Sequence, residues 1–170
     1  MKDSKSFKYI VIDFEGKNKN IREFSFLIVK RGIIDTVKEF VEPDSKMIEH
    51  EINALSDFGF DALVSHNAYV EKNFLNYISP YQIKDRKLQK WGPWLDTYNV
   101  YKQLYPNLKN YDLKSLTEKF VNQDTLDGLS EKHCSELNTK YHFATFDCIC
   151  TYLLLQRLEG RINLQMFLRW

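Results

Sequence analysis

The sequence predicts an α/β fold built on a mixed sheet, and three features support this fold class. Strand-like apolar segments cover residues 9–12, 23–30 and 33–41 at the start of the chain. The second and third are separated only by Arg31 and Gly32, which is typical of a hairpin. From residue 62 onward, short strand-like and longer helix-like segments alternate. An antiparallel start followed by this alternation predicts a mixed sheet flanked by helices.

The elements follow in order from these patterns. Residues 9–12 are apolar on both faces, as in a central strand covered on both sides, and lead into Asp13, Phe14, Glu15 and Gly16. The hairpin stops at Pro43. After the hairpin we expect short strands over 62–64 and just before 97. We expect helices over 47–55, 68–78, 98–105, 111–120 and 144–158. Residues 122–139 are predicted to form a polar loop with a short helical piece, and residues 162–170 an apolar tail.

Length and composition predict one domain over residues 1–170. The chain is 44% hydrophobic and 28% charged, as in globular proteins, and 15% aromatic, which serves either a core or base stacking. A formal charge of +1 gives the whole protein no attraction to polyanions, so any such attraction must come from local clusters of basic residues. The alternative is that each cluster is an ordinary solvated surface. The candidates are Lys17, Lys19 and Arg22, and then Lys84, Arg86, Lys87 and Lys90.

The cysteines and the lack of long apolar runs predict a cytoplasmic protein. Cys134, Cys148 and Cys150 fit no zinc spacing, and we expect all three to be reduced in a cytoplasmic protein. The first residues, from Met1 to Lys5, show no signal-peptide pattern. No apolar run reaches the roughly 20 residues that a membrane span needs, so we expect no membrane association.

Asp13 and Glu15 form the first candidate site. Side chains alternate along a strand, so these two carboxylates project from the same face. Two close carboxylates repel when ionised, and a hard divalent cation such as magnesium or manganese between them removes the conflict. The alternative is a polar strand end with two solvated acids, because the D-x-E pattern is common.

Two later segments add polar residues at helix starts. Glu71 falls in the first turn of the helix predicted after His66 and Asn67, where an acid is favoured by the helix dipole or faces a metal. His142 and Asp147 flank the start of the last long helix. Five helical positions correspond to roughly 140° of rotation, so the two converge only if His142 lies on the preceding loop and folds over the helix start. Taken alone, His142 is a surface histidine.

Read together and in order, these segments resemble the DEDDh exonuclease superfamily, which includes polymerase proofreading subunits, oligoribonuclease and RNase T. The resemblance covers about residues 9–155 and implies a ribonuclease-H-like fold. The segments that carry it are Val11-Ile12-Asp13-Phe14-Glu15, Ser65-His66-Asn67-Ala68 with Phe74-Leu75, the pair Asp96-Thr97, Tyr111-x-Leu113-x-x-Leu116, and His142-x-Ala144-x-x-Asp147.

The resemblance implies a 3′–5′ exonuclease that hydrolyses single-stranded DNA or RNA to nucleoside 5′-monophosphates with two Mg²⁺ or Mn²⁺ ions. The implied metal ligands are Asp13, Glu15, Glu71 and Asp147, and His142 is the implied general base. The implied substrate-binding residues are Phe14, Gly16, His66, Asn67 and Phe74. Core packing is the alternative for the two phenylalanines, and we expect His66 and Asn67 to shape their loop rather than bind metal.

Two positions depart from the family pattern. Glu71 stands where aspartate is usual, which predicts retained activity with a preference for manganese. Gly16 replaces a common threonine, and its missing side chain allows close approach of a nucleotide. The segment between Val41 and Ala62 is short for the family, which predicts an open edge of the site.

Alternatives to an active exonuclease remain at this stage. One is a catalytically weakened nucleic-acid-binding module, favoured by Glu71. Another is an interaction subunit that docks through the tail containing Met166, Phe167, Leu168 and Trp170, a tail that packs on its own sheet in the simpler interpretation. The sequence leaves open DNA or RNA as substrate, and action alone, as a homo-oligomer or with a polymerase.

Overall fold

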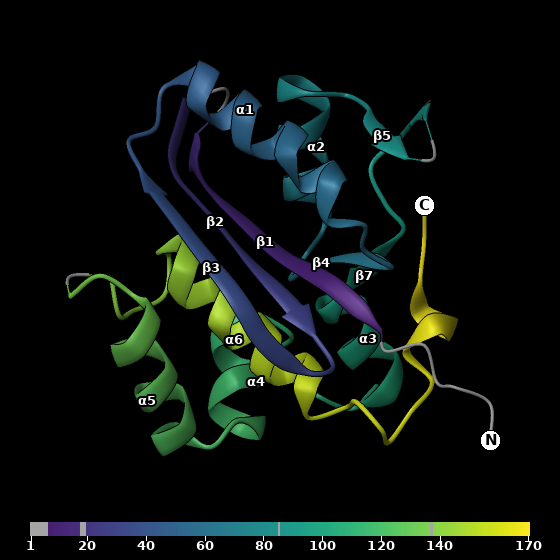
Figure 1. The fold of residues 1–170 in the computed structure, drawn as a ribbon. Coiled ribbons are helices and arrows are strands. Elements are labelled where there is room, and N and C mark those ends of the chain that lie inside the picture. Colours follow the sequence, from purple (N-terminus) through teal and green to yellow (C-terminus); the bar gives the residue numbers. More distant parts are fainter. Residues whose placement is uncertain (1–6, 18–19, 85, 137) are drawn as a thin grey trace.

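Five strands form the central sheet of this computed structural model, which describes residues 7–17, 20–84, 86–136 and 138–170 (Figure 1). Their order is β3-β2-β1-β4-β7. Strands β1 (Lys8–Lys17), β2 (Asn20–Lys30) and β3 (Ile33–Val41) are antiparallel, whereas β4 (Ala62–Ser65) and β7 (Trp94–Asp96) run parallel to β1. The predicted mixed sheet is therefore confirmed.

Helices cover both faces of the sheet (Figure 1). Helices α1 (Ser45–Leu55) and α2 (Tyr69–Ile78) lie on one face. On the other face, α6 (Ala144–Gln156) lies against β1 and β2, and α3 (Thr97–Leu104), α4 (Leu113–Phe120) and α5 (Gln123–His133) pack around it. Every residue of α6 from Ala144 to Leu155 is buried. This position explains why α6 is apolar on all sides.

Strand β1 divides the interior into two cores because its side chains alternate between the faces of the sheet. Tyr9 and Val11 pack in the core that contains α6. Ile10, Ile12 and Phe14 pack in the core beneath α1 and α2. The apolar character of residues 9–12 on both faces thus reflects helices on both sides, as predicted.

Three segments differ from the sequence prediction. Residues 123–133, expected as a loop with a short helical piece, form the eleven-residue α5, which begins where the Asn122 side chain accepts from the Thr125 amide at 3.0 Å. Strand β1 continues to Lys17, so Asp13 and Glu15 lie within it rather than after it. A small hairpin of β5 (Gln82–Lys84) and β6 (Lys87–Gln89) was not predicted because its residues are mostly polar.

The C-terminal tail packs on its own sheet. Arg169 forms an antiparallel bridge to Trp94 of β7, with backbone N–O distances of 2.7 and 2.9 Å. A 3₁₀ turn over Leu164–Phe167 precedes it, and another, Ser56–Phe58, follows α1. Met166 and Trp170 remain exposed. The simpler interpretation of the tail is therefore the one that the structure supports.

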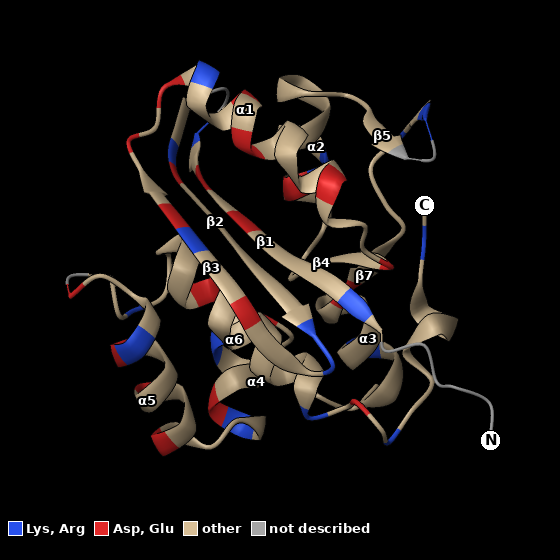
Figure 2. Cartoon of the chain, viewed as in Figure 1, with Lys and Arg blue, Asp and Glu red and all other residues tan. Residues whose placement is uncertain are grey.

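Basic side chains are not concentrated in one region. In the view of Figure 2, lysines and arginines are spread over many elements rather than gathered on one face. Arg86, Lys87 and Lys90 are exposed at the β5–β6 hairpin, while Lys19 lies outside the described residues. Cys134, Cys148 and Cys150 are free thiols, as expected. In the described part of the chain, no helix has both the length and the apolar character needed to traverse a bilayer.

Candidate metal and catalytic site

Asp13 and Glu15 project from β1 toward the start of α6. In the β1–β2 register, Asp13 lies opposite Ser25 and Glu15 lies opposite Glu23. Both β2 residues contact the first turn of α6, because the Thr145 hydroxyl is 3.0 Å from Ser25 Oγ and the Ala144 amide donates to Glu23 Oε2 at 3.1 Å. The two acids of β1 therefore share one face of the strand, as predicted.

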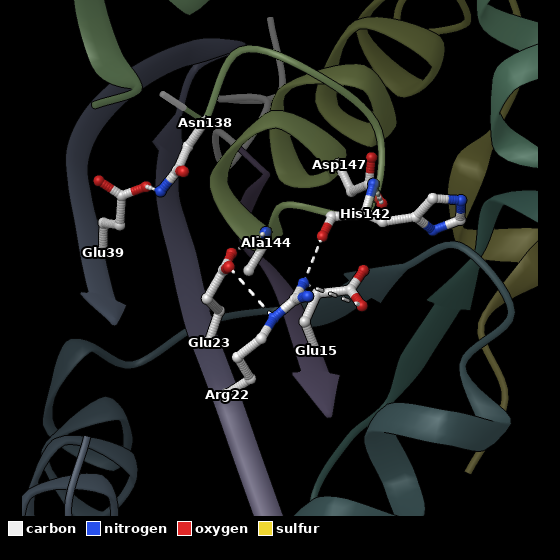
Figure 3. A network of polar contacts seen from close by, with 8 residues as sticks. All are labelled: Glu15, Arg22, Glu23, Glu39, Asn138, His142, Ala144 and Asp147. Atoms are coloured by element: carbon white, nitrogen blue, oxygen red, sulfur yellow. Dashed lines mark hydrogen bonds and ion pairs between the residues drawn. The ribbon is translucent and has the colours of Figure 1, made fainter. Parts of the chain in front are cut away.

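His142 lies on the turn before α6 and comes close to Asp147 (Figure 3). Its backbone amide donates to Asp147 Oδ2 at 3.1 Å. Its φ of 68° is the left-handed conformation, which is uncommon outside glycine and lets the turn fold back over the helix start. One ligand atom each from Glu15, His142 and Asp147 lie within 4.8 Å of one another. The convergence required of His142 is thus achieved by the turn.

Glu71 completes an acidic cluster from the other side of the sheet. It lies in the first turn of α2 and is 3% exposed. Three buried carboxylate oxygens have no hydrogen-bond partner among the described residues: Asp13 Oδ2, Glu71 Oε2 and Asp147 Oδ1. Unpartnered buried polar atoms are costly, and a cation bound among these oxygens would offset that cost.

Electrostatics point to the same conclusion. Burial raises the pKa of Glu71 to about 8 and that of Asp147 to about 7. Burial, with Glu71, Asp147 and Glu15 nearby, raises the pKa of Asp13 well above its usual range. Burial also raises the pKa of Glu15, although His142 and Arg22 oppose the shift. Without a cation, Glu71 and Asp147 therefore tend to hold protons near neutral pH, and a bound cation would reverse that preference.

The donor set fits a hard divalent cation. Carboxylate oxygens are the ligands that magnesium and manganese prefer. The residues available are Asp13, Glu15, Glu71 and Asp147, with the His142 imidazole at the rim. Glutamate at position 71 does not keep its carboxylate out of the cluster, because that carboxylate is buried and interacts electrostatically with Asp13.

Arg22 and Glu23 lie beside the acidic cluster, although the sequence pointed to Arg22 only as a candidate cation for attracting phosphate and did not single out Glu23. Glu23 is 4% exposed and accepts from the first amide of α6, so it acts as an anionic cap supplied by a neighbouring strand. Arg22 Nε is 3.3 Å from Glu23 Oε1. An acid beside an apolar strand is the only sequence signal for Glu23, and it is weak because the partner Ala144 lies 121 residues away.

His66 and Asn67 hold the loop between β4 and α2. His66 Nε2 lies 2.9 Å from the Tyr111 carbonyl and Nδ1 lies 2.8 Å from Thr97 Oγ1. A carbonyl only accepts, so Nε2 donates, and Nδ1 then accepts from the hydroxyl in the neutral ring. The backbone N–H of Asn67 donates to Asp96 Oδ1 at 2.9 Å, and the φ of Asn67 is 67°. Both residues have the loop-shaping contacts that we expected.

Phe14, Phe74 and Gly16 have structural contacts of their own. Phe14 and Phe74 are 4% and 8% exposed, and their ring centroids lie 5.3 Å apart in the core beneath α1 and α2. A Cβ at Gly16 would lie 2.1 Å from the Asn20 carbonyl oxygen. The close approach that requires glycine here is to the chain's own hairpin, and the close approach of a nucleotide at Gly16 stays a prediction.

Two clefts lie in this part of the molecule, and one of them includes a residue of the acidic cluster. One of about 640 Å³ begins at Glu15 and Gly16 and continues along Lys17 and Arg22 toward the start of α1. The other, about 450 Å³, lies between the starts of α2 and α3 and is closed by the C-terminal segment at Phe167 and Arg169. Either cleft is large enough for a nucleotide-sized ligand.

Sequence comparison identifies two relatives that align with most of this chain. The chain is 30% identical over 179 residues to DNA polymerase III PolC-type of Bacillus subtilis strain 168, and this alignment covers 89% of the chain. It is 26% identical over 95% of its length to the PolC-type polymerase of Pediococcus pentosaceus. The chain spans only 11% and 12% of these two relatives. No family model matches the sequence.

A solved structure shares the fold. Exonuclease X, in a complex with 5′-overhanging duplex DNA, superposes with a TM-score of 0.57 at 19% sequence identity. The match covers 94% of this chain and 96% of that one. The arrangement of a mixed sheet with helices on both faces is thus the ribonuclease-H-like fold that the motifs predicted.

Proposed function

From the resemblance to the DEDDh exonuclease superfamily, which the sequence relatives and the fold support, we propose that this chain is a metal-dependent 3′–5′ exonuclease. The observation that carries the proposal is the set of three buried carboxylate oxygens without partners, from Asp13, Glu71 and Asp147. A protein that needed these acids only for its fold would pair them, because an unpaired buried charge costs several kcal/mol, on the order of the whole net stability.

The proposed roles follow from position and chemistry. Asp13, Glu15, Glu71 and Asp147 hold two divalent ions, Mg²⁺ or Mn²⁺, which when bound supply an activated water and neutralise charge on the scissile phosphate and the leaving oxygen. His142 is exposed, at the rim of the cluster, where its imidazole accepts the proton of the attacking water. The turn that carries it is fixed to Asp147, a ligand of the same cluster.

DNA is the first substrate to test. The sequence relatives are named as DNA polymerases, and the solved structure that shares the fold holds DNA with a single-stranded overhang. We propose that a single-stranded 3′ end enters along the cleft that begins at Glu15, where the Lys17 side chain can contact a phosphate, and that nucleoside 5′-monophosphates leave. Association with a polymerase is a second element of the proposal, based on the same relatives.

The test uses a 5′-labelled single-stranded oligonucleotide, as DNA and as RNA, in magnesium, manganese or EDTA. We expect a ladder that shortens from the 3′ end, disappears in EDTA and is absent with Asp13→Ala. As a control, Asp57→Ala removes an exposed acid from the turn after α1 and should leave the ladder intact. Retained binding of the oligonucleotide without any shortening in either metal would instead identify the chain as a nucleic-acid-binding module on this fold.

A further inference from the structure

Arg22 connects three segments at the edge of the acidic cluster (Figure 3). Its Nη2 donates to the His142 carbonyl oxygen at 2.6 Å. The same nitrogen lies 3.9 Å from Glu15 Oε2, and Nε lies 3.3 Å from Glu23 Oε1. The guanidinium carbon also lies 5.5 Å from the centre of the Phe143 ring. One side chain of β2 thus contacts β1 and the turn before α6.

The contact with the turn bears on the position of His142. A φ of 68° at a residue other than glycine persists only where the surroundings hold it. Two hydrogen bonds do so, one from the His142 amide to Asp147 and one from Arg22 to the His142 carbonyl. A charge-assisted hydrogen bond is the stronger kind, and it fixes the carbonyl end of the residue that carries the imidazole.

Arg22 also contributes charge. In the described part of the chain, it is the one basic side chain that forms an ion pair with either Glu15 or Glu23. Its positive charge partly compensates the negative charges of Glu15 and Glu23 when no cation is bound. The same charge opposes binding of a metal ion at Glu15, because like charges close together repel.

Resting on the proposed exonuclease activity, we propose that Arg22 is a positioning residue that holds the His142 turn over the metal ligands and weakens the affinity of Glu15 for a cation. The two effects depend on different properties of arginine. Holding the turn requires the planar guanidinium, which donates to His142 and Glu23 in different directions, whereas the effect on the cation requires only positive charge.

Two variants separate these properties. Arg22→Lys keeps the charge and loses the planar fork, and Arg22→Gln loses both. We expect each to lower kcat by roughly 10- to 100-fold with little change in KM, since a misplacement of about 1 Å costs about that much. Only Arg22→Gln should bind Mn²⁺ several-fold more tightly. Arg161→Ala, an exposed arginine beyond the far end of α6, is the matched control and should change neither quantity.

A readout that needs neither metal nor substrate comes from hydrogen exchange. In EDTA, exchange of the His142 amide measured by NMR should be on the order of tenfold faster in both Arg22 variants than in the wild type and in Arg161→Ala. A structural effect spread over the whole domain would instead accelerate exchange throughout β1 and α6, and would lower the melting temperature in parallel.

The outcomes separate this inference from the proposed function. Wild-type kcat and wild-type amide exchange in Arg22→Lys would overturn the inference while leaving the nuclease intact. A raised KM with unchanged kcat would also overturn it, because it would make Arg22, 52% exposed in its side chain, a contact for the substrate strand. An inactive wild type would contradict the proposed function, and the amide exchange would still decide whether Arg22 holds the turn.

Discussion

Replacing Glu71 by glutamine should stabilise the metal-free protein near neutral pH. Burial raises the pKa of Glu71 from 4.5 to about 8, so between these values the native state holds a proton that the unfolded state has released. The contribution of that proton to the free energy of unfolding is fully present below pH 4.5 and is lost as pH rises from 4.5 to about 8. At pH 7 the cost of protonating this one group is about 3 kcal/mol, and at pH 5 it is below about 1 kcal/mol.

The assay is urea unfolding in EDTA from pH 5 to pH 8, with wild type, Glu71→Gln and the exposed-acid control Glu49→Gln. We expect Glu71→Gln to gain stability over wild type as pH rises, and Glu49→Gln to follow wild type. Adding magnesium should stabilise wild type and stabilise Glu71→Gln less, because the amide is a poorer ligand. Equal stability of wild type and Glu71→Gln at every pH would refute the reasoning that burial raises the pKa of this carboxyl in the native state.

Three further predictions test individual residues. His142→Ala should lower kcat by about 10²- to 10⁴-fold while magnesium still raises the melting temperature, and loss of that rise would make His142 chiefly a metal ligand. Glu71→Asp should raise activity in magnesium relative to manganese, and an unchanged ratio of the two rates would contradict a misfit at this position. Gly16→Ala should lower the free energy of unfolding, measured by chemical denaturation, by about 1–3 kcal/mol, because its Cβ would meet Asn20. The control Gly128→Ala, on the open face of α5, should be neutral or stabilising. Equal effects of the two substitutions would contradict the hairpin explanation.

Sequence patterns predicted those elements whose apolar periodicity matches their burial. Strand β1 and helix α6 were recognisable because the first is apolar on both faces and the second on all sides, which follows from their places inside the fold. Helix α5 was predicted only as a short helical piece because few of its residues are buried, so local capping at Asn122 rather than an apolar stripe marks its start. The β5–β6 hairpin has only one apolar residue in each three-residue strand, Ile83 and Leu88, and both are exposed, so no buried face marks it in the sequence.

The candidate site divides in the same way. Asp13 and Glu15 could be placed on one face because two-residue alternation is a local property of a strand. The closeness of His142 to Asp147 depends on a left-handed turn, which a histidine does not announce in sequence. The contacts of Arg22 and Glu23 with the start of α6 were not predicted because the partners in these hydrogen bonds lie about 120 positions away.

Manganese soaked into crystals of the protein tests the central claim most directly. Anomalous scattering at the manganese edge locates the ion without reference to activity, and Asp13→Ala crystals provide the control. The account predicts anomalous density within about 2.0–2.6 Å of carboxylate oxygens from Asp13, Glu15 and Asp147, with Glu71 facing the same site. Absence of density there at millimolar manganese, or density only at exposed surface acids, would contradict it.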